Sequence, residues 1–336
     1  MTWQRRLSRG ATRLEAALDR IWPKRGNDRP PVIDPYLGYA SGSEIVLRGR
    51  VLTALRRSEP RPEQGRLTNL RQMVNLFLTD EVEGVRVRAR GQSALSDEEG
   101  YFTLPVPRRE GERGWIEIPL EGDTDTLKSG KDVLRAFIPG PDARFGVISD
   151  IDDTLLETGA WRRSRMAWTS LTGNILTRRI FPDAIELLTR LNEDGRNPVF
   201  YVSSSPWNLH DFLARLFQRN GLVDGPMFLR DLGIAEDQLI TAGHGDHKGG
   251  AIDVIMAANP DLPFVLVGDT GQHDAQIYEA ATRRHEGRIR RVILRAPGRG
   301  ADPADHVHIR QMRTRGVTVD CGPTFAATLE ALTVEA

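Results

Sequence analysis

The sequence has one cysteine, no long apolar run and no excess charge of either sign. Cys321, alone among 336 residues, cannot form a disulfide within the chain and is typical of a reducing compartment. No apolar run approaches the roughly 18 residues that a membrane span needs, and the N-terminus lacks the apolar core of a secretory signal. The 46 basic and 46 acidic residues cancel, so no overall field attracts nucleic acid. We expect a cytoplasmic protein without a transmembrane segment.

Residues 1–25 carry apolar residues at helical spacing and many basic residues on the other face. The apolar stripe contains Leu7, Ala11, Leu14, Leu18, Ile21 and Trp22. This pattern predicts an amphipathic helix, which lies either on an anionic membrane surface or against protein. Peripheral contact with the inner membrane surface therefore stays open. The proline- and glycine-containing residues 26–40 are predicted to be a linker.

Residues 41–124 show the alternation of apolar and polar residues that is typical of strands. The alternating runs are Ser43–Thr53, Val85–Arg90, Tyr101–Val106 and Trp115–Leu120. Period two with turns between the runs predicts a small antiparallel β-sandwich of transthyretin or immunoglobulin type. The stretch Ser96–Phe102 resembles the hairpin of transthyretin-like sandwiches. With no catalytic grouping here, we expect a structural or recognition module.

From Phe145 the pattern changes to short apolar runs that alternate with helical stretches. The apolar runs are Phe145–Ile148, Pro198–Val202, Phe264–Val267 and Arg291–Leu294. The helical stretches between them are Pro182–Glu193, Pro206–Asn220, Ala251–Ala258 and Asp274–Arg284. Continuous apolar strands alternating with helices predict an α/β domain with a mostly parallel sheet and helices on both faces.

Polar side chains follow three of these strands, and a lysine stands in a glycine-rich turn. They are Asp150, Asp152, Thr154, Ser203, Ser204, Lys248, Asp269 and Asp274. The carboxyl ends of parallel strands meet at one edge of a sheet, where ligands bind. Crowded carboxylates repel each other unless a cation lies among them. The pattern therefore predicts a metal-dependent phosphate site.

Each residue type has a chemical task in such a site. Asp150 and Asp269 offer the one or two carboxylates that Mg²⁺ needs beside water and phosphate. The Ser203 hydroxyl, the Ser204 backbone N–H and the Lys248 ammonium group are donors suited to a phosphoryl group. A second carboxyl group, Asp152, two residues after a nucleophilic one, can protonate a leaving group and then activate water.

The order of these motifs resembles the haloacid dehalogenase (HAD) superfamily. The strings SDIDDT, YVSSSPWNL, HKGGAI and VGDTGQHDAQIY are similar to the catalytic domain of the actin-patch type of phosphatidate phosphatase. The resemblance covers about residues 125–320, and we assign residues 125–336 to this domain. It implies a Rossmann-like sheet with small cap insertions and Mg²⁺-dependent removal of phosphate from phosphatidate, giving diacylglycerol.

The resemblance also implies a role for each matched residue. Asp150 is the nucleophile that forms a phospho-aspartate, and Asp152 is the general acid and base, whose backbone carbonyl also holds the metal. Ser203 and Lys248 bind the phosphoryl group. Asp269 ligates the metal, and Asp274 supports it directly or through water. The block GDTGQHD departs from the family in two positions, where serine and often glutamate are expected, and neither position has a core role.

Other residues near the motifs have simpler explanations. Asp153 is expected to cap a turn and Ser205 to cap the helix that follows it. The segment after the nucleophile mixes aromatic residues with arginines, which suits either a lipid–water interface or an ordinary cap helix pair. The candidate entrance residues are Trp161, Arg162, Arg163, Trp168 and Trp207.

The sequence is compatible with three functions. The favoured one is a phosphatidate phosphatase that works at a membrane surface. The second is a phosphatase of the same superfamily that acts on a soluble phosphomonoester or a phosphoprotein, because one motif set serves many substrates. The third is a catalytically inert scaffold in which the β module is the working part. Nucleic-acid binding is not expected, since no recognition motif is present.

Overall fold

The computed structural model describes residues 31–53, 81–121, 133–156, 179–230, 247–298 and 300–335. The helix predicted over residues 1–25 and the entrance residues Trp161, Arg162, Arg163 and Trp168 lie outside these ranges. Within them, no helix combines the length and the apolar character that crossing a membrane requires.

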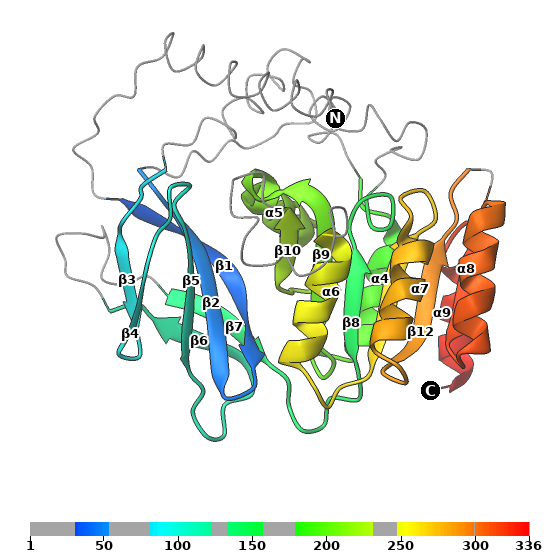
Figure 1. The fold of residues 1–336 in the computed structure, drawn as a ribbon, viewed down its shortest axis with the longest axis horizontal. Helices are drawn as coiled ribbons and strands as arrows, with labels where there is room; N and C mark the ends of the chain where they lie inside the picture. The colour runs from blue at the N-terminus through cyan, green and yellow to red at the C-terminus, as the bar shows by residue number, and fades with distance from the viewer. Residues whose placement is uncertain are drawn as a thin grey trace, which may run out of the picture.

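The first part of the chain is a β module, drawn in blue to cyan-green in Figure 1. Its five-stranded sheet runs in the order β5 (Tyr101–Pro107), β2 (Glu44–Leu52), β1 (Val32–Ser41), β7 (Val133–Ile138) and β6 (Gly114–Pro119). A hairpin of β3 (Arg86–Ala89) and β4 (Gln92–Leu95) shares its apolar core. Neighbouring strands are antiparallel except β1 and β7. The predicted antiparallel β region is therefore confirmed.

The structure moves both predicted boundaries of this module. The linker predicted over residues 26–40 is a strand from Val32 onward. Pro35 fits in this strand because β1 pairs with β7 only at Gly38 and Tyr39, so no N–H is needed toward β7 at Pro35. Strand β7, placed in the catalytic domain by the predicted boundary at 125, completes the sheet of the β module instead. An apolar run by itself does not reveal which sheet it joins.

The second part is an α/β domain whose six strands are all parallel to their neighbours. They lie in the order β10 (Met227–Arg230), β9 (Val199–Pro206), β8 (Gly146–Asp150), β11 (Phe264–Asp269), β12 (Ile289–Arg295) and β13 (Thr318–Gly322). Successive strands are added on one side of β8 and then on the other. The boundary between β8 and β11 is thus the topological switch point, where ligands bind in such sheets. The predicted Rossmann-like architecture is confirmed.

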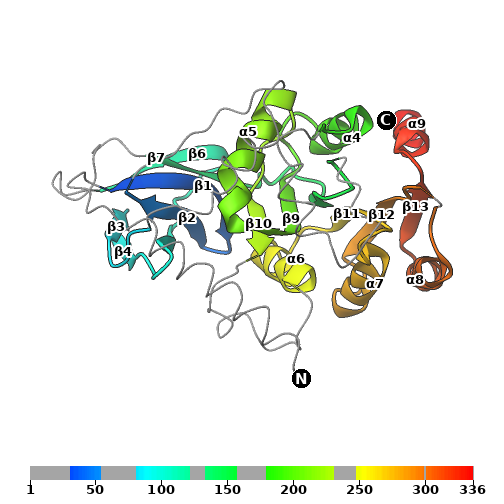
Figure 2. The same cartoon turned by 90° about the horizontal axis from the view of Figure 1, so that it is seen from above.

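Helices cover both faces of this sheet (Figure 2). One face carries α4 (Pro182–Asn192), α5 (His210–Asn220) and α9 (Ala326–Glu335). The other carries α6 (His247–Ala258), α7 (Asp274–Arg284) and α8 (Pro303–Thr314). The strands are buried on both sides, which is why they appear in the sequence as continuous apolar runs.

One predicted helix starts later than expected. Strand β9 continues to Pro206, and the short 3₁₀ helix η3 (Trp207–Leu209) separates it from α5, which begins at His210 rather than at Pro206. The serines before Pro206 thus lie in extended backbone. Two of them, Ser203 and Ser205, donate hydrogen bonds to Asp152, which lies two residues beyond the end of β8.

Candidate active site

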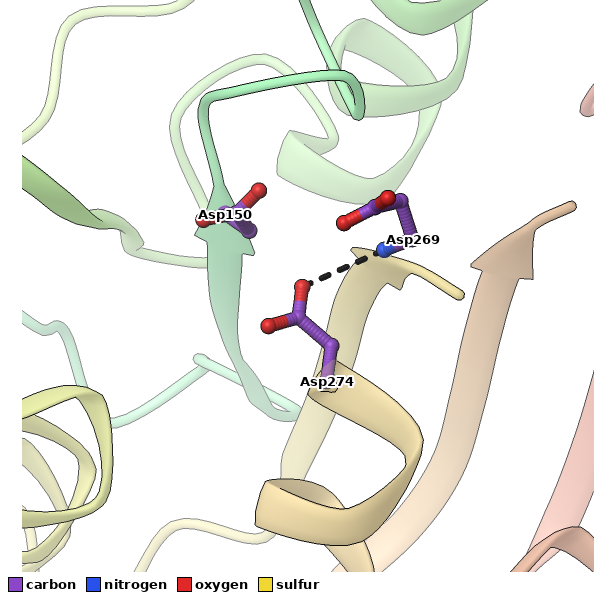
Figure 3. A group of neighbouring side chains, drawn as sticks. All are labelled: Asp150, Asp269 and Asp274. Atoms are coloured by element: carbon purple, nitrogen blue, oxygen red, sulfur yellow. Dashed lines mark hydrogen bonds between the residues drawn. The ribbon is translucent and has the colours of Figure 1, made fainter. Parts of the chain in front are cut away.

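Three fully buried aspartates meet at the switch point of the parallel sheet. Asp150 is the last residue of β8, Asp269 is the last residue of β11, and Asp274 is the first residue of α7. Each offers a carboxylate oxygen within 4.8 Å of the others. Figure 3 shows the three carboxyl groups around a common space. The structure thus brings together three of the four predicted metal residues through their carboxylates.

Lys248, the second residue of α6, is buried against two of these aspartates. Its Nζ lies 2.7 Å from Oδ1 of Asp150 and 2.6 Å from Oδ1 of Asp274. Burial alone lowers the pKa of a lysine, but the carboxylates of Asp150 and Asp274 outweigh it and raise the pKa of Lys248 above its usual value. Lys248 is therefore a permanent positive charge in this site.

One ammonium group does not balance three buried carboxyl groups. Burial raises the pKa of Asp150 well above its usual value, Lys248 opposes this shift, and the carboxyl groups of Asp274 and Asp152 add to it. Burial also raises the pKa of Asp269, and the same repulsion from Asp274 and Asp150 adds to that rise. A cation among these oxygens would oppose both shifts, because it stabilises the charged form of each carboxyl group.

Two oxygen atoms in the cluster are suited to that cation. In the described part of the chain no hydrogen bond reaches Oδ2 of Asp150 or Oδ1 of Asp269, although both atoms are buried. Buried carboxylate oxygens are otherwise paired in proteins. Hard divalent cations such as Mg²⁺ take oxygen ligands of this kind. The residues present therefore fit a hard divalent metal ion.

Backbone hydrogen bonds hold two of the acids in place. The N–H of Asp269 donates to Oδ2 of Asp274 over 3.2 Å, drawn as the dashed line in Figure 3, and the N–H of Gly271 donates to Oδ2 of Asp269 over 2.7 Å. A Cβ atom on Gly268 would lie 2.6 Å from Oδ2 of Asp274. Glycine is required before Asp269 because Asp274 approaches the backbone there so closely.

The general acid predicted at Asp152 is held by two serines of β9. The hydroxyl groups of Ser203 and Ser205 donate to Oδ2 of Asp152 over 2.7 and 3.0 Å, and the N–H of Ser205 donates to Oγ of Ser203 over 2.8 Å. The side chain of Ser205 is therefore a hydrogen-bond donor to Asp152 and not the predicted helix cap. Side chains alternate between the two faces of an extended strand, so Ser203 and Ser205 lie on the same face. This spacing in the sequence was the available signal that both serines contact the same group. Ser204 between them is exposed.

Gln272 is a further residue that contacts this site. The side-chain amide of Gln272 donates to the backbone carbonyl of Asp152 over 3.1 Å, a contact that motif reading did not predict. This carbonyl is the metal ligand that the family resemblance implies, so Gln272 contacts the site from the β11–α7 loop.

Asp153 has a φ of 56°, a left-handed conformation that aspartate tolerates in turns. This conformation agrees with the prediction that Asp153 is a turn residue.

Trp207, a predicted entrance residue, packs against the β module. Its ring stacks on that of Tyr36 in β1, with centroids 5.0 Å apart and an interplanar angle of 7°. The other four predicted entrance residues lie outside the described ranges. In the described structure Trp207 is thus part of the contact between the two folded parts of the chain.

Comparison with known proteins shows what the α/β domain is similar to. Residues 145–296 match the family model described as the catalytic domain of phosphatidate phosphatase APP1. The chain is 26% identical over 180 residues to phosphatidate phosphatase APP1 of Saccharomyces cerevisiae, a stretch that covers 54% of this chain and 30% of the yeast protein. It is also 26% identical over 235 residues to an uncharacterized protein of Schizosaccharomyces pombe, covering 66% of this chain and 37% of that protein.

These matches confirm the predicted family resemblance for residues 145–296, as distant homology. Phosphatidate phosphatases are phosphoric monoester hydrolases, so the matched stretch is similar to the catalytic domain of an enzyme of the predicted class. The matched stretches span only 30% and 37% of the length of these curated relatives.

Proposed function

We propose that the protein is a Mg²⁺-dependent phosphatase that hydrolyses phosphatidate to diacylglycerol and phosphate. The observation that carries this proposal is the buried group of Asp150, Asp269 and Asp274 around Lys248 at the switch point of a domain matched to a phosphatidate phosphatase family. We also propose that the enzyme meets its lipid substrate as a peripheral protein at the inner membrane surface.

In the first half of the proposed reaction, a carboxylate oxygen of Asp150 attacks phosphorus, and the bond from phosphorus to the diacylglycerol oxygen breaks. Asp152 gives its proton to that oxygen as diacylglycerol leaves. On substrate binding the hydroxyl group of Ser203 turns from Asp152 to a phosphoryl oxygen, because it has only one proton to donate. The backbone N–H of Ser204 and the ammonium group of Lys248 donate to the other phosphoryl oxygens. The product of this half is a phospho-aspartate at Asp150.

In the second half, Asp152 takes a proton from a water molecule, which attacks the phospho-aspartate. The bond from phosphorus to the Asp150 oxygen breaks, and inorganic phosphate leaves. Bound Mg²⁺ supplies neutralisation of the phosphate charge. Its proposed ligands are the carboxylates of Asp150 and Asp269 and the backbone carbonyl of Asp152, with Asp274 in support. The burial of these groups keeps competing water away from them.

The test is phosphate release from phosphatidate in detergent micelles, compared with release from sugar phosphates, nucleotides and a phosphopeptide, each with Mg²⁺ and with EDTA. Activity is expected on phosphatidate in Mg²⁺ and is lost in EDTA. Asp150→Asn is expected to lower turnover at least about a thousandfold because it removes the nucleophile. Unchanged turnover by this variant would contradict the mechanism.

A second candidate is a phosphatase of a soluble phosphomonoester or a phosphoprotein. The buried acids and Lys248 serve this chemistry equally well, since they contact only the phosphoryl group. Activity confined to the soluble substrates would establish this alternative. An inert scaffold is less well supported, because unpaired carboxylate oxygens in Asp150 and Asp269 destabilise a protein that does not use them.

A further inference from the structure

The β module contacts the residues that directly follow the serines of β9. Tyr36 of β1 stacks on Trp207 at 5.0 Å between ring centroids, and its ring centroid lies 3.9 Å from that of His210. Tyr36 is 4% exposed. The segment from Trp207 to His210, which joins β9 to α5, thus packs on an aromatic side chain of another folded part.

Polar contacts with the β module also hold the segment from Trp207 to His210. Oδ1 of Asn208 accepts hydrogen bonds from the Arg50 guanidinium over 3.4 Å and from the Tyr101 hydroxyl over 3.3 Å. Arg48 lies over the ring of Trp207 with Cζ 5.4 Å from its centroid. Strands β1, β2 and β5 therefore all contribute a residue to this contact.

The segment 207–210, which contacts the β module, begins two residues after Ser205. The hydroxyl group of Ser205 donates to Asp152. The path is short: Pro206 alone separates Ser205 from Trp207, and the φ angle of proline is fixed by its ring. The hydroxyl groups of Ser203 and Ser205 both donate to Oδ2 of Asp152. A shift of Trp207 would therefore move Ser205 and the hydrogen bonds that orient this carboxyl group. Displacements of about 1 Å at a reacting group cost up to about a hundredfold in rate.

We propose that the β module is a positioning element of the active site: Tyr36, Arg50 and Tyr101 hold residues 207–210 and, through Ser205, fix the carboxyl group of Asp152. The catalytic part of this proposal rests on the proposed phosphatase function. The structural part, a dependence of the serine segment on Tyr36, does not. The β module is thereby given a role beyond stabilising the chain.

The test compares three variants of the full chain. Tyr36→Ala removes the ring under Trp207, Tyr36→Phe keeps it, and Tyr39→Ala removes a second buried tyrosine of β1 that packs on Phe228 of β10, with centroids 5.3 Å apart. Two measurements are made on each: hydrogen exchange by mass spectrometry over residues 199–210, and steady-state hydrolysis of phosphatidate in micelles and of p-nitrophenyl phosphate.

For Tyr36→Ala we expect exchange at residues 203–209 to be about tenfold faster and kcat to fall about tenfold, the order that a misplaced general acid costs. Tyr36→Phe is expected to match the wild type in both measurements. Tyr39→Ala is expected to lower the melting temperature while leaving exchange at 203–209 and kcat within about twofold of wild type. Equal effects of the two alanine variants would overturn the proposal, as would unchanged exchange in folded Tyr36→Ala.

A milder variant covers the case in which Tyr36→Ala does not fold. Asn208→Ala truncates a half-buried side chain and removes only the acceptor shared by Arg50 and Tyr101. It is expected to speed exchange at 203–209 and to lower kcat in the same direction, and wild-type values in both would reject the proposal. Should the wild type hydrolyse neither substrate, the proposed function fails, and the exchange data still decide whether the β module orders the serine segment.

Discussion

The ammonium group of Lys248 lies 2.7 Å from a carboxylate oxygen of Asp150, the proposed nucleophile. Lys248 was predicted to bind the phosphoryl group, and the structure shows that its ammonium also contacts Asp274 at 2.6 Å. A lysine has three donors, so one remains for a phosphate oxygen while two orient carboxylates. One side chain can thus offset part of the negative charge of the aspartates and contribute to substrate binding.

Replacing this lysine tests how strongly the acids depend on it. Lys248→Met leaves Asp150 and Asp274 buried without their cation, so we expect the free energy of unfolding in EDTA to fall by about 3–5 kcal/mol. Excess Mg²⁺ is expected to recover part of the loss. Urea unfolding measures both, with Arg135→Met as the control, since its ion pair with Asp224 is half exposed and contributes at most about 1 kcal/mol. An unchanged urea midpoint in Lys248→Met would contradict this account.

Metal binding has a readout that is independent of activity. Mg²⁺ at 100 times its dissociation constant is expected to stabilise the wild type by about 2.7 kcal/mol, seen as a rise in melting temperature that EDTA reverses. Asp269→Asn is expected to lose most of this rise because it removes a ligand oxygen. Asp253→Asn, which changes a half-exposed acid on α6, is expected to keep it. The same Mg²⁺ response in both variants would place the metal elsewhere.

Ser205 is predicted to matter through Asp152. Ser205→Ala removes a hydroxyl group that donates to Oδ2 of Asp152, and we expect kcat to fall about tenfold and stability by about 1 kcal/mol. Ser205→Thr keeps a hydroxyl group in a residue suited to strands and is expected to recover most of the rate. Steady-state kinetics with the proposed substrate decides, and wild-type kcat in the alanine variant would show that Ser203 suffices.

Arg295, the last residue of β12, supports the loop after the nucleophile. Its Nε donates to the carbonyl of Thr154 over 3.1 Å, a terminal nitrogen donates to Asp183 over 2.8 Å, and Cζ lies 4.1 Å from the ring centroids of Phe181 and Phe325. We expect Arg295→Met to destabilise the protein by about 3–5 kcal/mol. Arg295→Lys should not rescue it, because lysine lacks the planar fork. Chemical denaturation measures both, and full stability of the lysine variant would refute the geometric role.

His210, in the contact between the two folded parts, predicts a pH dependence of stability. Burial, helped by the charge of Arg48, lowers the pKa of His210 to about 3 from its usual value of 6.5. The unfolded chain therefore binds a proton at higher pH than the folded one does.

The sign of this effect follows directly. Stability is expected to fall as pH drops from about 6.5 toward 3, by up to about 1.4 kcal/mol per pH unit from this residue. Urea midpoints of wild type and His210→Phe across this range measure it, and the variant should show a shallower slope. Parallel curves for the two proteins would mean that the pKa of His210 is the same in the folded and unfolded chains.

Local sequence patterns determined many of the strands and helices of this protein and the position of its acidic site. The apolar runs that end in Asp150 and Asp269 predicted both strands and the edge where their acids meet, because burial on two faces and the parallel topology leave few alternatives. The predicted helix Asp274–Arg284 agrees with α7 residue for residue. These features depend on residues close together in the chain, and their physical causes are periodicity and the energy of buried charge.

The tertiary structure determined which residues far apart in the chain contact each other. Ser205 was suited to cap a helix, but its hydroxyl group donates to the carboxyl group of Asp152, two residues beyond the end of β8, and β9 stays extended to Pro206. The apolar run Val133–Ile138 joined the β module and not the α/β sheet, and Trp207 packed on Tyr36 from a strand far away in sequence. Each of these contacts joins residues far apart in the sequence, so only the arrangement of distant segments determines it.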